Sequence, residues 1–412
     1  MQKPAHLKDH PPALTVSLSR LFGIFFRLGA TSYGGPLAGM ATFRDEFVDR
    51  RGWISPARYA EILMLVKLLP GPSATSMGIQ MGRDLGGNLG GVAAGLGFIL
   101  PAFVLASLLF LGMKQLPMEN LLAQGLLNGA KAGAWILIAS SILPLARATS
   151  WSRFQFGIFA LALVLVFKHP THEALILLGA GFLSVLRERI LAQPYSPRDL
   201  ISSALGAPLL LSKTGILAAA SPFLPLHQAT LFQLFKTCFL AGAFTFGTGL
   251  AVLPVLRGEF VDLQHWLSQD EFLNAIVIGQ ITPGPVLITA TVLGFMSLNW
   301  AGALAATVGA FLPAFLYGLV VVPRFWGRIK NHRFTPAFIS GALPAVVGAL
   351  SAVTLQLFPA KNLVQTSPVV RDTLIELAPY FTGMTLVLLT RVPHWLIIPA
   401  TALTGLLVQI VL

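Results

Sequence analysis

The hydrophobic positions of this chain come in long runs separated by short polar stretches. Two of these runs, 91–111 and 301–322, carry no charged residue and reach the roughly 20 residues needed to cross the hydrocarbon core of a bilayer. The pattern therefore predicts an all-α, polytopic membrane protein.

Each half of the chain is predicted to contain six apolar segments. In the first half they lie near 16–42, 59–82, 88–112, 119–146, 154–168 and 173–187, and in the second near 230–256, 271–295, 299–323, 336–358, 371–391 and 393–412. We divide the chain into a membrane repeat at 1–187, a linker at 188–229 and a second repeat at 230–412. Within the linker, 201–220 is uncharged apart from Lys213, which leaves an interfacial helix and an extra span both open.

The two halves are copies of one unit. When residues 29–72 are aligned with 242–285, 15 of the 44 positions are identical, where unrelated chains would share about three. The identities include Arg44 with Arg257, Glu46 with Glu259, and a Pro-Gly-Pro triplet at 70–72 and 283–285. A shift of 212 then aligns Pro101 with Pro313. The chain is therefore two homologous helical halves.

Composition agrees with a membrane protein. Hydrophobic residues make up 55% of the chain and charged residues 11%, against about 25% in soluble domains. The mean hydropathy is +0.75. The net charge of +12 comes from basic residues lying mainly between apolar runs, where they contact anionic lipid headgroups. We therefore expect the lipid bilayer, and not nucleic acid, as the partner.

No enzyme, metal or cofactor site is expected. The single cysteine, Cys238, cannot form an internal disulfide, and the eight histidines show no H-E-x-x-H or paired Cys/His spacing. There is no phosphate-binding loop of the Walker type, so direct ATP-driven transport by this chain is not expected.

The positive-inside rule raises a conflict in the first half. It would place both the N-terminus and the first connection in the cytoplasm, although only one apolar segment separates them. The basic residues concerned are Lys3, Lys8, Arg20, Arg44, Arg50, Arg51 and Arg58. Either 16–42 folds back on itself near Tyr33–Pro36, or one basic cluster lies outside.

The two Pro-Gly-Pro triplets interrupt apolar segments. Proline removes a backbone donor, and the polar groups freed in this way need partners inside a bilayer. Repeated broken helices of this kind are typical of secondary transporters, whose sites lie near the midplane. If helix restarts after each triplet, its first amide groups can bind an oxyanion. The alternative is a packing kink whose hydroxyl groups bond to their own helix.

Candidate substrate-binding residues follow from these breaks and from two small polar segments that interrupt the first helix of each half. They are Thr31, Ser32, Lys67, Pro70, Gly71, Pro72, Ser73, Thr75, Ser76, Thr245, Thr248, Pro283, Gly284, Pro285 and Thr289. Lys67 is included because a cation beside helix N-termini would favour an anion, although a lysine can also extend to the interface. No catalytic residue is assigned.

A second set of charged residues is assigned to a gate or to coupling. It contains Arg44, Glu46, Arg257, Glu259 and Lys131. Trp53 and Trp266 follow the paired Arg/Glu motifs. Because tryptophan is enriched at membrane interfaces, these motifs are expected to lie there. The alternative role for these motifs is to fix a loop structurally.

Taken together, these motifs resemble the chromate ion transporter family, in its long-chain, two-domain form. The shared pattern is Gly-x-x-(Ser/Thr)-(Tyr/Phe)-Gly, then Arg-x-Glu-Phe-Val-Asp, a tryptophan, Pro-Gly-Pro and Leu-Pro-Ala-Phe. It appears at 29–103 and again at 242–315, a little over a third of the sequence.

The resemblance implies a multi-pass protein of the bacterial inner membrane that exports chromate and confers resistance, driven by membrane potential or a proton gradient. It also implies halves of opposite orientation, whereas six spans per half would make them parallel unless the linker crosses an odd number of times. A carrier of sulfate or another small anion is the alternative. A homodimer is left open.

Overall fold

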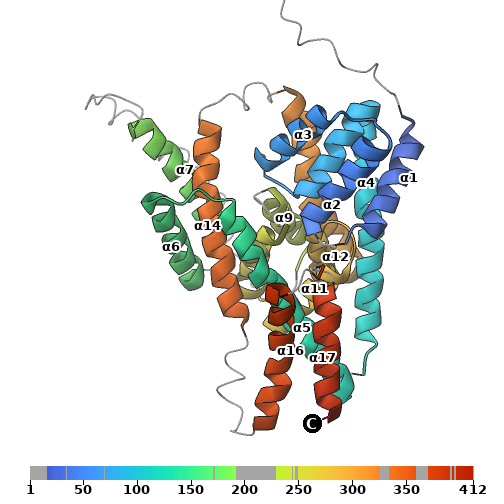
Figure 1. Cartoon of the computed structure of the whole chain (residues 1–412), viewed down its shortest axis with the longest axis vertical. Coiled ribbons are helices and arrows are strands. Elements are labelled where there is room, and N and C mark those ends of the chain that lie inside the picture. Colours follow the sequence, from blue (N-terminus) through green and yellow to red (C-terminus); the bar gives the residue numbers. More distant parts are fainter. Residues whose placement is uncertain are drawn as a thin grey trace, which may run out of the picture.

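The computed structural model describes residues 16–33, 35–68, 70–117, 119–169, 172–191, 229–243, 245, 249–324, 334–358, 370–389, 392–393 and 396–411. In these ranges the regular elements are all helices, as the sequence predicted (Figure 1). The predicted linker at 188–229 lies almost entirely outside them, as does Thr248.

The first half contains α1 (Leu18–Thr31), α2 (Gly35–Arg44), the π-helical turn η1 (Asp45–Arg50), α3 (Pro56–Leu68), α4 (Ser73–Lys114), α5 (Leu121–Arg147), α6 (Arg153–Lys168) and α7 (Glu173–Leu191). The second half contains α9 (Leu231–Ala243), η3 (Gly249–Val252), α10 (Leu253–Arg257), η4 (Gly258–Leu263), α11 (Gln269–Ile281), η5 (Val286–Ile288), α12 (Thr289–Leu316), η6 (Tyr317–Val321), α14 (Phe334–Leu357), α16 (Val370–Leu389) and α17 (Ile397–Val411).

Helices α4 and α12 each contain a sharp reversal. In α4 the backbone leaves helical geometry at Gly86 and Gly87, and Gly87 has φ +66°. Gly82 and Gly90 consequently touch, although a straight helix would hold them about 12 Å apart. In α12 the reversal falls at 298–299, the positions that the repeat aligns with 86–87. Each helix is therefore a short arm (73–85, 289–297) followed by a long arm (88–114, 300–316).

The first apolar segment of the chain folds back on itself. The Arg27 guanidinium in α1 lies 2.7 Å from the Glu46 carboxylate in η1. Arg20, near the start of α1, and Arg51 both lie over the ring of Trp53, at 5.2 and 4.7 Å from its centre. We call 18–50 hairpin A. The structure follows the first alternative for 16–42, so Arg20 and the basic residues of the first connection lie on one face, which we call face 1; Lys3 and Lys8 lie outside the described residues.

Helix α3 and the short arm of α4 form a second hairpin, which we call hairpin B. Arg58 at the start of α3 donates to Asp84 at the end of the short arm, with an Nε–Oδ2 distance of 2.7 Å. The amide of Val16 donates to the carbonyl of Leu85 at 2.9 Å, so hairpins A and B open on the same face. Each arm of hairpin B has 13 residues, too few to span a bilayer. The interpretation of 59–82 as a span was therefore wrong.

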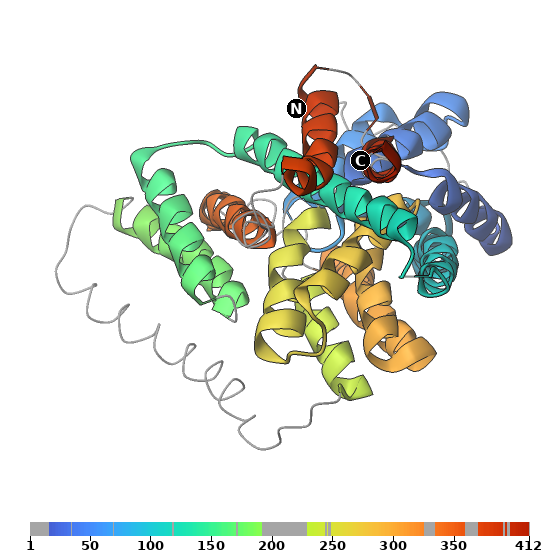
Figure 2. The same cartoon turned by 90° about the horizontal axis from the view of Figure 1, so that it is seen from below.

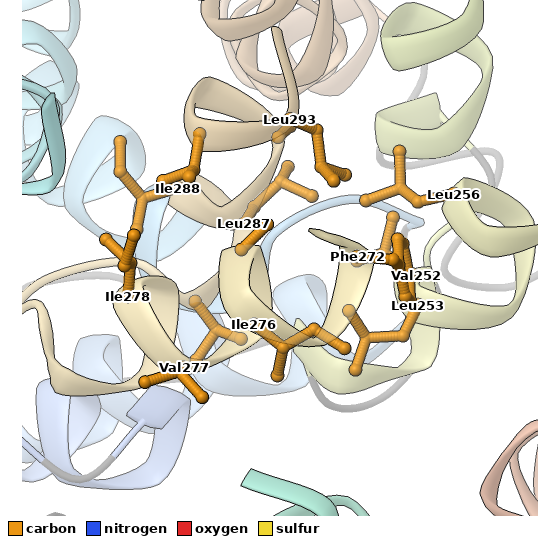
Figure 3. Packing of buried hydrophobic residues seen from close by; sticks show 14 of the residues in the cluster. Val252, Leu253, Leu256, Phe272, Ile276, Val277, Ile278, Leu287, Ile288 and Leu293 are labelled. Atoms are coloured by element: carbon orange, nitrogen blue, oxygen red, sulfur yellow. The ribbon is translucent and has the colours of Figure 1, made fainter. Parts of the chain in front are cut away.

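The second half repeats both hairpins. Hairpin C is formed by α9 with 249–263, and its Phe260 packs on Trp266 as Phe47 packs on Trp53. Hairpin D is formed by α11 with 289–297, where Gly279 and Thr289 touch across the two arms. Buried side chains of the two hairpins meet in one apolar core, with Val252, Leu253 and Leu256 beside Phe272 and Ile276 (Figure 3).

The long arms show that the two halves have opposite orientations. Gly95 of the first long arm lies against the ring of Phe315 in the second, and Gly91 lies against Leu319 of η6, which continues the second long arm. About 28 Å further along the first arm, Phe110 packs on Phe295, at the open end of hairpin D. The equivalent arms therefore run antiparallel. Hairpins C and D open on the opposite membrane face, which we call face 2.

The remaining helices are exchanged between the halves. Helix α5 of the first half packs on α16 and α17 of the second, whereas α14 of the second packs on α6 and α7 of the first (Figures 1 and 2). Gly129 and Gly341, which the repeat aligns, allow these close approaches against Thr401 and Ala180. The halves are therefore interlocked.

Two single-cysteine variants test the inverted arrangement. Asp49→Cys lies on face 1 and Leu263→Cys on face 2, and both native side chains are about half exposed. The native Cys238 is fully buried, so it will not react. In oriented vesicles a membrane-impermeant maleimide should label one variant from outside and the other only after lysis. Labelling of both from the same side would contradict the arrangement.

Glu46 predicts an acid-sensitive contribution to stability. Burial alone would raise its pKa, but the guanidinium groups of Arg51 and Arg27 outweigh burial and hold the pKa of Glu46 below its ordinary value of 4.5. A lowered pKa stabilises the fold above the ordinary value, and this stabilisation is lost as pH falls through the lowered one. Glu46→Gln should reduce the free energy of unfolding by about 2 kcal/mol at pH 7.

Thermal unfolding in detergent checks this prediction. The difference between Glu46→Gln and the parent protein should shrink as the pH falls below 4.5 and through the lowered pKa of Glu46, because the parent carboxyl then becomes protonated. Asp45→Asn, whose side chain is half exposed in its pair with Arg50, is the matched control and should change stability by less than about 1 kcal/mol.

Candidate functional site

The tips of all four hairpins meet. At the tip of hairpin B the amide of Gly71 donates to the carbonyl of Thr245, at the tip of hairpin C, with a distance of 2.7 Å. At the tip of hairpin D the amide of Gly284 donates to the carbonyl of Ser32, at the tip of hairpin A, at 2.9 Å. The repeat aligns Gly71 with Gly284 and Ser32 with Thr245. The two hydrogen bonds are thus symmetry equivalents, and we call them the clasp.

The clasp explains the Pro-Gly-Pro sequence. Proline has no amide hydrogen, so glycine is the only residue of each triplet able to donate from its backbone. Gly71 has φ +124° and Gly284 has φ +110°, a region that residues with a Cβ rarely occupy. The triplet therefore both ends the helix and offers one donor to the opposite half.

The clasp lies about halfway along the long arms. A side chain at Gly284 would come within 2.9 Å of Ala102 and 3.2 Å of the Gly29 carbonyl oxygen, and Ala102 lies near the middle of 88–114. Gly71 lies beside the ring of Tyr317, whose hydroxyl donates to the Ala243 carbonyl at 3.2 Å. The tips therefore meet about midway between the two faces.

Helix restarts directly after each triplet. Helix α4 begins at Ser73 and η5 begins at Val286, and neither start has a side-chain cap, because the preceding residue is a proline. The amides of a first helical turn have no partner within their own helix and carry partial positive charge. Two such turns therefore flank the clasp.

The hydroxyl groups at the tips fall into two classes. Those of Thr245 and Thr289 bond to carbonyls of their own segments, Ala241 and Val286. In contrast, Ser32 Oγ and Thr75 Oγ1 are buried and form no hydrogen bond with any described residue. A buried hydroxyl left without a partner costs free energy unless a ligand or water satisfies it.

The predicted substrate-binding residues differ in their burial. Those that the structure buries at the tips are Ser32, Gly71, Pro72, Ser73, Thr75, Thr245, Pro283, Pro285 and Thr289. Pro70, Ser76 and Gly284 are half-buried there. Thr31 is exposed and bonds to the Arg27 carbonyl, and Lys67 is exposed and forms no ion pair with a described residue. Lys67 is thus beside the tip of hairpin B without belonging to its buried set.

The charged residues of the second set lie away from the tips. Arg44 is exposed and 3.7 Å from Asp49, at the open end of hairpin A. Arg257 is buried at the open end of hairpin C, 3.1 Å from Asp262 and hydrogen-bonded to Gln356. Lys131 of α5 lies 3.1 Å from Asp270, at the open end of hairpin D. These positions are at the two faces and not at the clasp.

Two further polar residues near the tips, Gln80 and Tyr317, were not predicted from the sequence. Gln80 Nε2 donates to the Gly318 carbonyl at 3.0 Å, within the π-helical turn η6. The Oε1 atom of Gln80 has no partner among the described residues. The repeat aligns Gln80 with Val292 and Tyr317 with Leu105. A polar residue in one copy opposite an apolar residue in the other was the signal that could have found them.

The two clasp glycines should not tolerate a side chain. Gly71→Ala has space, so its cost is backbone strain of about 1–3 kcal/mol. Gly284→Ala adds a collision with Ala102 and should be more destabilising. Gly23→Ala is the control, because nothing lies within 4 Å of its Cβ position. In thermal unfolding Gly23→Ala should be the most stable variant, Gly71→Ala less stable and Gly284→Ala the least stable. Equal stability of all three would contradict the clasp.

Comparisons with known proteins agree with this architecture. The model of a family described as "Chromate transporter" matches residues 19–185 and again 232–406. A "Probable chromate transport protein" of Synechococcus elongatus is 31% identical over 85% of this chain and 88% of its own length. A "Chromate transport protein" of Cupriavidus metallidurans is 30% identical over 89% of this chain and 88% of its own.

A "Chromate transport protein" of Pseudomonas aeruginosa is 31% identical, covering 84% of this chain and 82% of its own length. No solved structure matches the chain. The family match accounts for the duplicated helical unit in both halves. This chain therefore belongs to the chromate transporter family, a family of membrane transporters.

Proposed function

We propose that this protein is a secondary active transporter that exports chromate across the bacterial inner membrane and so confers chromate resistance, driven by the membrane potential or a proton gradient. The observation that carries the proposal is the clasp, which brings four interrupted segments together midway through an inverted repeat. The names of the relatives support chromate as the substrate.

The tips suit a tetrahedral dianion. Such an ion enters a low-dielectric site only if donors replace its water shell. The first turns after Pro72 and Pro285 supply amides, and Ser32 and Thr75 supply hydroxyls without partners. Because no charged side chain is buried among the predicted tip residues, the anion would be held without a tight ion pair that could prevent its release.

The charge distribution supports the direction of transport. Among the described residues, face 1 carries Arg20, Arg44, Arg50, Arg51 and Arg58 at helix ends and connections, whereas the repeat leaves only Arg257 at the five equivalent positions of face 2. The positive-inside rule then assigns face 1 to the cytoplasm. Moving one negative charge from face 1 to face 2 under an inside-negative potential of about 100 mV is favourable by about 2.3 kcal/mol. Export of a dianion would therefore use the resting potential.

The inverted repeat supplies a means of alternating access. Hairpins A and B open on face 1 and hairpins C and D on face 2, and each clasp hydrogen bond joins one hairpin of each kind. Separation of one pair of tips would open the site toward one face while the opposite pair keeps the other closed. Inverted repeats with broken helices at the midplane are common in secondary transporters.

Sulfate is the second candidate substrate. The donors named above are amides and hydroxyls, which bind any tetrahedral oxyanion of similar size and do not select for chromium. A competition experiment in which sulfate, phosphate and molybdate are added to chromate separates a selective carrier from a general one.

Transport into proteoliposomes tests the proposal. Purified protein with an imposed potential should accumulate radiolabelled chromate, and Thr75→Val and Ser32→Ala should each weaken chromate transport about tenfold, the effect of losing about 1.4 kcal/mol of binding. Thr401→Val is the matched control, because Thr401 is fully buried in α17 and bonds to its own helix. It should transport chromate normally.

Chromate flux no greater than in empty liposomes would end the proposed function. Normal flux in both tip variants would leave the transport function intact but would remove the clasp as the binding site. Cosedimentation with the membrane and a normal elution volume in detergent serve as checks that each variant is folded.

A further inference from the structure

Outside the clasp, the most unusual group in the described part of the chain is the side chain of Glu173. It is the first residue of α7, is only 2% exposed, and neither of its carboxylate oxygens has a hydrogen-bond partner among the described residues. A buried, ionised carboxylate without a donor is costly, so a purely structural residue at this place would be expected to be apolar.

The surroundings of Glu173 come from both halves of the protein. Its charge interacts with that of Arg257 in α10, which favours the ionised form, and with those of Asp262 and Glu259 in η4, which oppose it. Arg257 is itself buried, forms an ion pair with Asp262 and donates a hydrogen bond to Gln356. Glu173 is therefore held between one cation and two competing acids.

Other titratable groups lie around this cluster. His169 and His172 occupy the connection before α7, with ring centres 6.4 Å apart. Lys236 of α9 interacts with Glu259, and His265 interacts with Asp262. The α14 residue that reaches the cluster, Gln356, is neutral. The N-terminus of α7 adds partial positive charge beside Glu173. Burial, together with Asp262 and Glu259, favours the protonated carboxyl of Glu173, whereas Arg257 favours the ionised form.

Glu173 has no charged counterpart in the second half. The turn before α7 aligns with the turn before α17 at a shift of 223, which places Leu396 opposite Glu173. A charged residue that one repeat has and the other lacks is not needed to build the repeated fold. The cluster also lies at the open end of hairpin C, next to face 2 and one residue from the exposed His172.

We propose that the Glu173 carboxyl is the site at which this transporter binds its coupling proton, taken from face 2. The proposal deepens the proposed function and rests on it. Arg257 lies at the end of α10, a short distance along the chain from Thr245, whose carbonyl accepts one clasp hydrogen bond. Protonation of Glu173 removes the negative charge that attracts Arg257. The second arm of hairpin C is then free to move and to pull Thr245 away from Gly71.

Transport measurements with Glu173→Gln test the site. Glutamine has the shape of a protonated glutamate and cannot release a proton. In proteoliposomes with no potential, a pH gradient should stimulate chromate flux by the parent protein. The same gradient should leave Glu173→Gln at its rate without a gradient. Chromate exchange between the two sides of the membrane at equal pH should stay within about twofold of the parent, because the clasp is intact.

Two further variants make the result specific. Glu173→Asp keeps a titratable carboxyl and should recover part of the stimulation, with a shifted pH profile. Glu119→Gln removes an exposed carboxyl from a connection and should behave like the parent protein. Full stimulation in Glu173→Gln would overturn the proposal while leaving chromate transport in place, and so would chromate flux that ignores the pH gradient in the parent.

A measurement that needs no chromate separates this site from the transport function. Infrared spectra of the parent and Glu173→Gln, recorded from about pH 5 to about pH 8, should differ by one protonated-carboxyl band that disappears as pH rises. A band that is absent throughout, or present and unchanged throughout, would show that Glu173 does not exchange a proton in this range and would overturn the proposal even if chromate is transported.

Discussion

Inside a bilayer no water is present to satisfy a backbone amide or carbonyl, so a chain that leaves helical geometry there must find a partner within the protein. This constraint accounts for the centre of the molecule. Each half breaks its helices twice, and each break supplies what the other half needs: a glycine amide from a Pro-Gly-Pro triplet, and a carbonyl from the small polar segment at the tip of hairpin A or C. Neither half could satisfy these groups alone.

The exchange of peripheral helices extends the same interdependence to the edges. Helix α5 packs on the second half and α14 on the first, through glycines that admit the neighbouring backbone. A movement of either half is therefore transmitted to helices of the other. In a carrier of the proposed kind, which opens alternately to two faces, this coupling would keep the two openings from occurring together.

Much of this architecture could be predicted from sequence. The duplication, the all-α class and the four broken segments follow from identities and from proline and glycine positions, because these reflect backbone chemistry. Boundaries between apolar segments were predicted at 83–87 and 296–298, close to the two reversals, but the segments before them were taken as spans, because a run of apolar residues looks the same whether it crosses the membrane or returns. For the same reason hairpins A and B could not be told from spans by hydropathy alone.

The contacts of particular side chains were harder to predict from the sequence. The pattern gave the same weight to Ser32, Thr75, Thr245 and Thr289, but the structure separates them, because two of these hydroxyls bond to their own segments and two do not. Lys67 was selected for its charge and position along the chain, yet the side of α3 on which it lies is exposed. Such differences depend on which helix packs against the side chain, and the residues close to it in the sequence do not determine that helix.

The open ends of hairpins A and C show why the halves are not interchangeable. Glu46 has two arginine partners, Arg27 and Arg51, and the repeat replaces these with Leu240 and Gln264 beside Glu259. In the first half the acid is saturated by positive charge, which fixes hairpin A. In the second half Arg257 is buried between two acids, Asp262 and Glu173, and Glu173 is supplied by α7. Under the proposed orientation and proton site, a scaffold with near-symmetric tips would carry an asymmetric control, in which hairpin C at the outer face changes its charge and hairpin A at the cytoplasmic face is held.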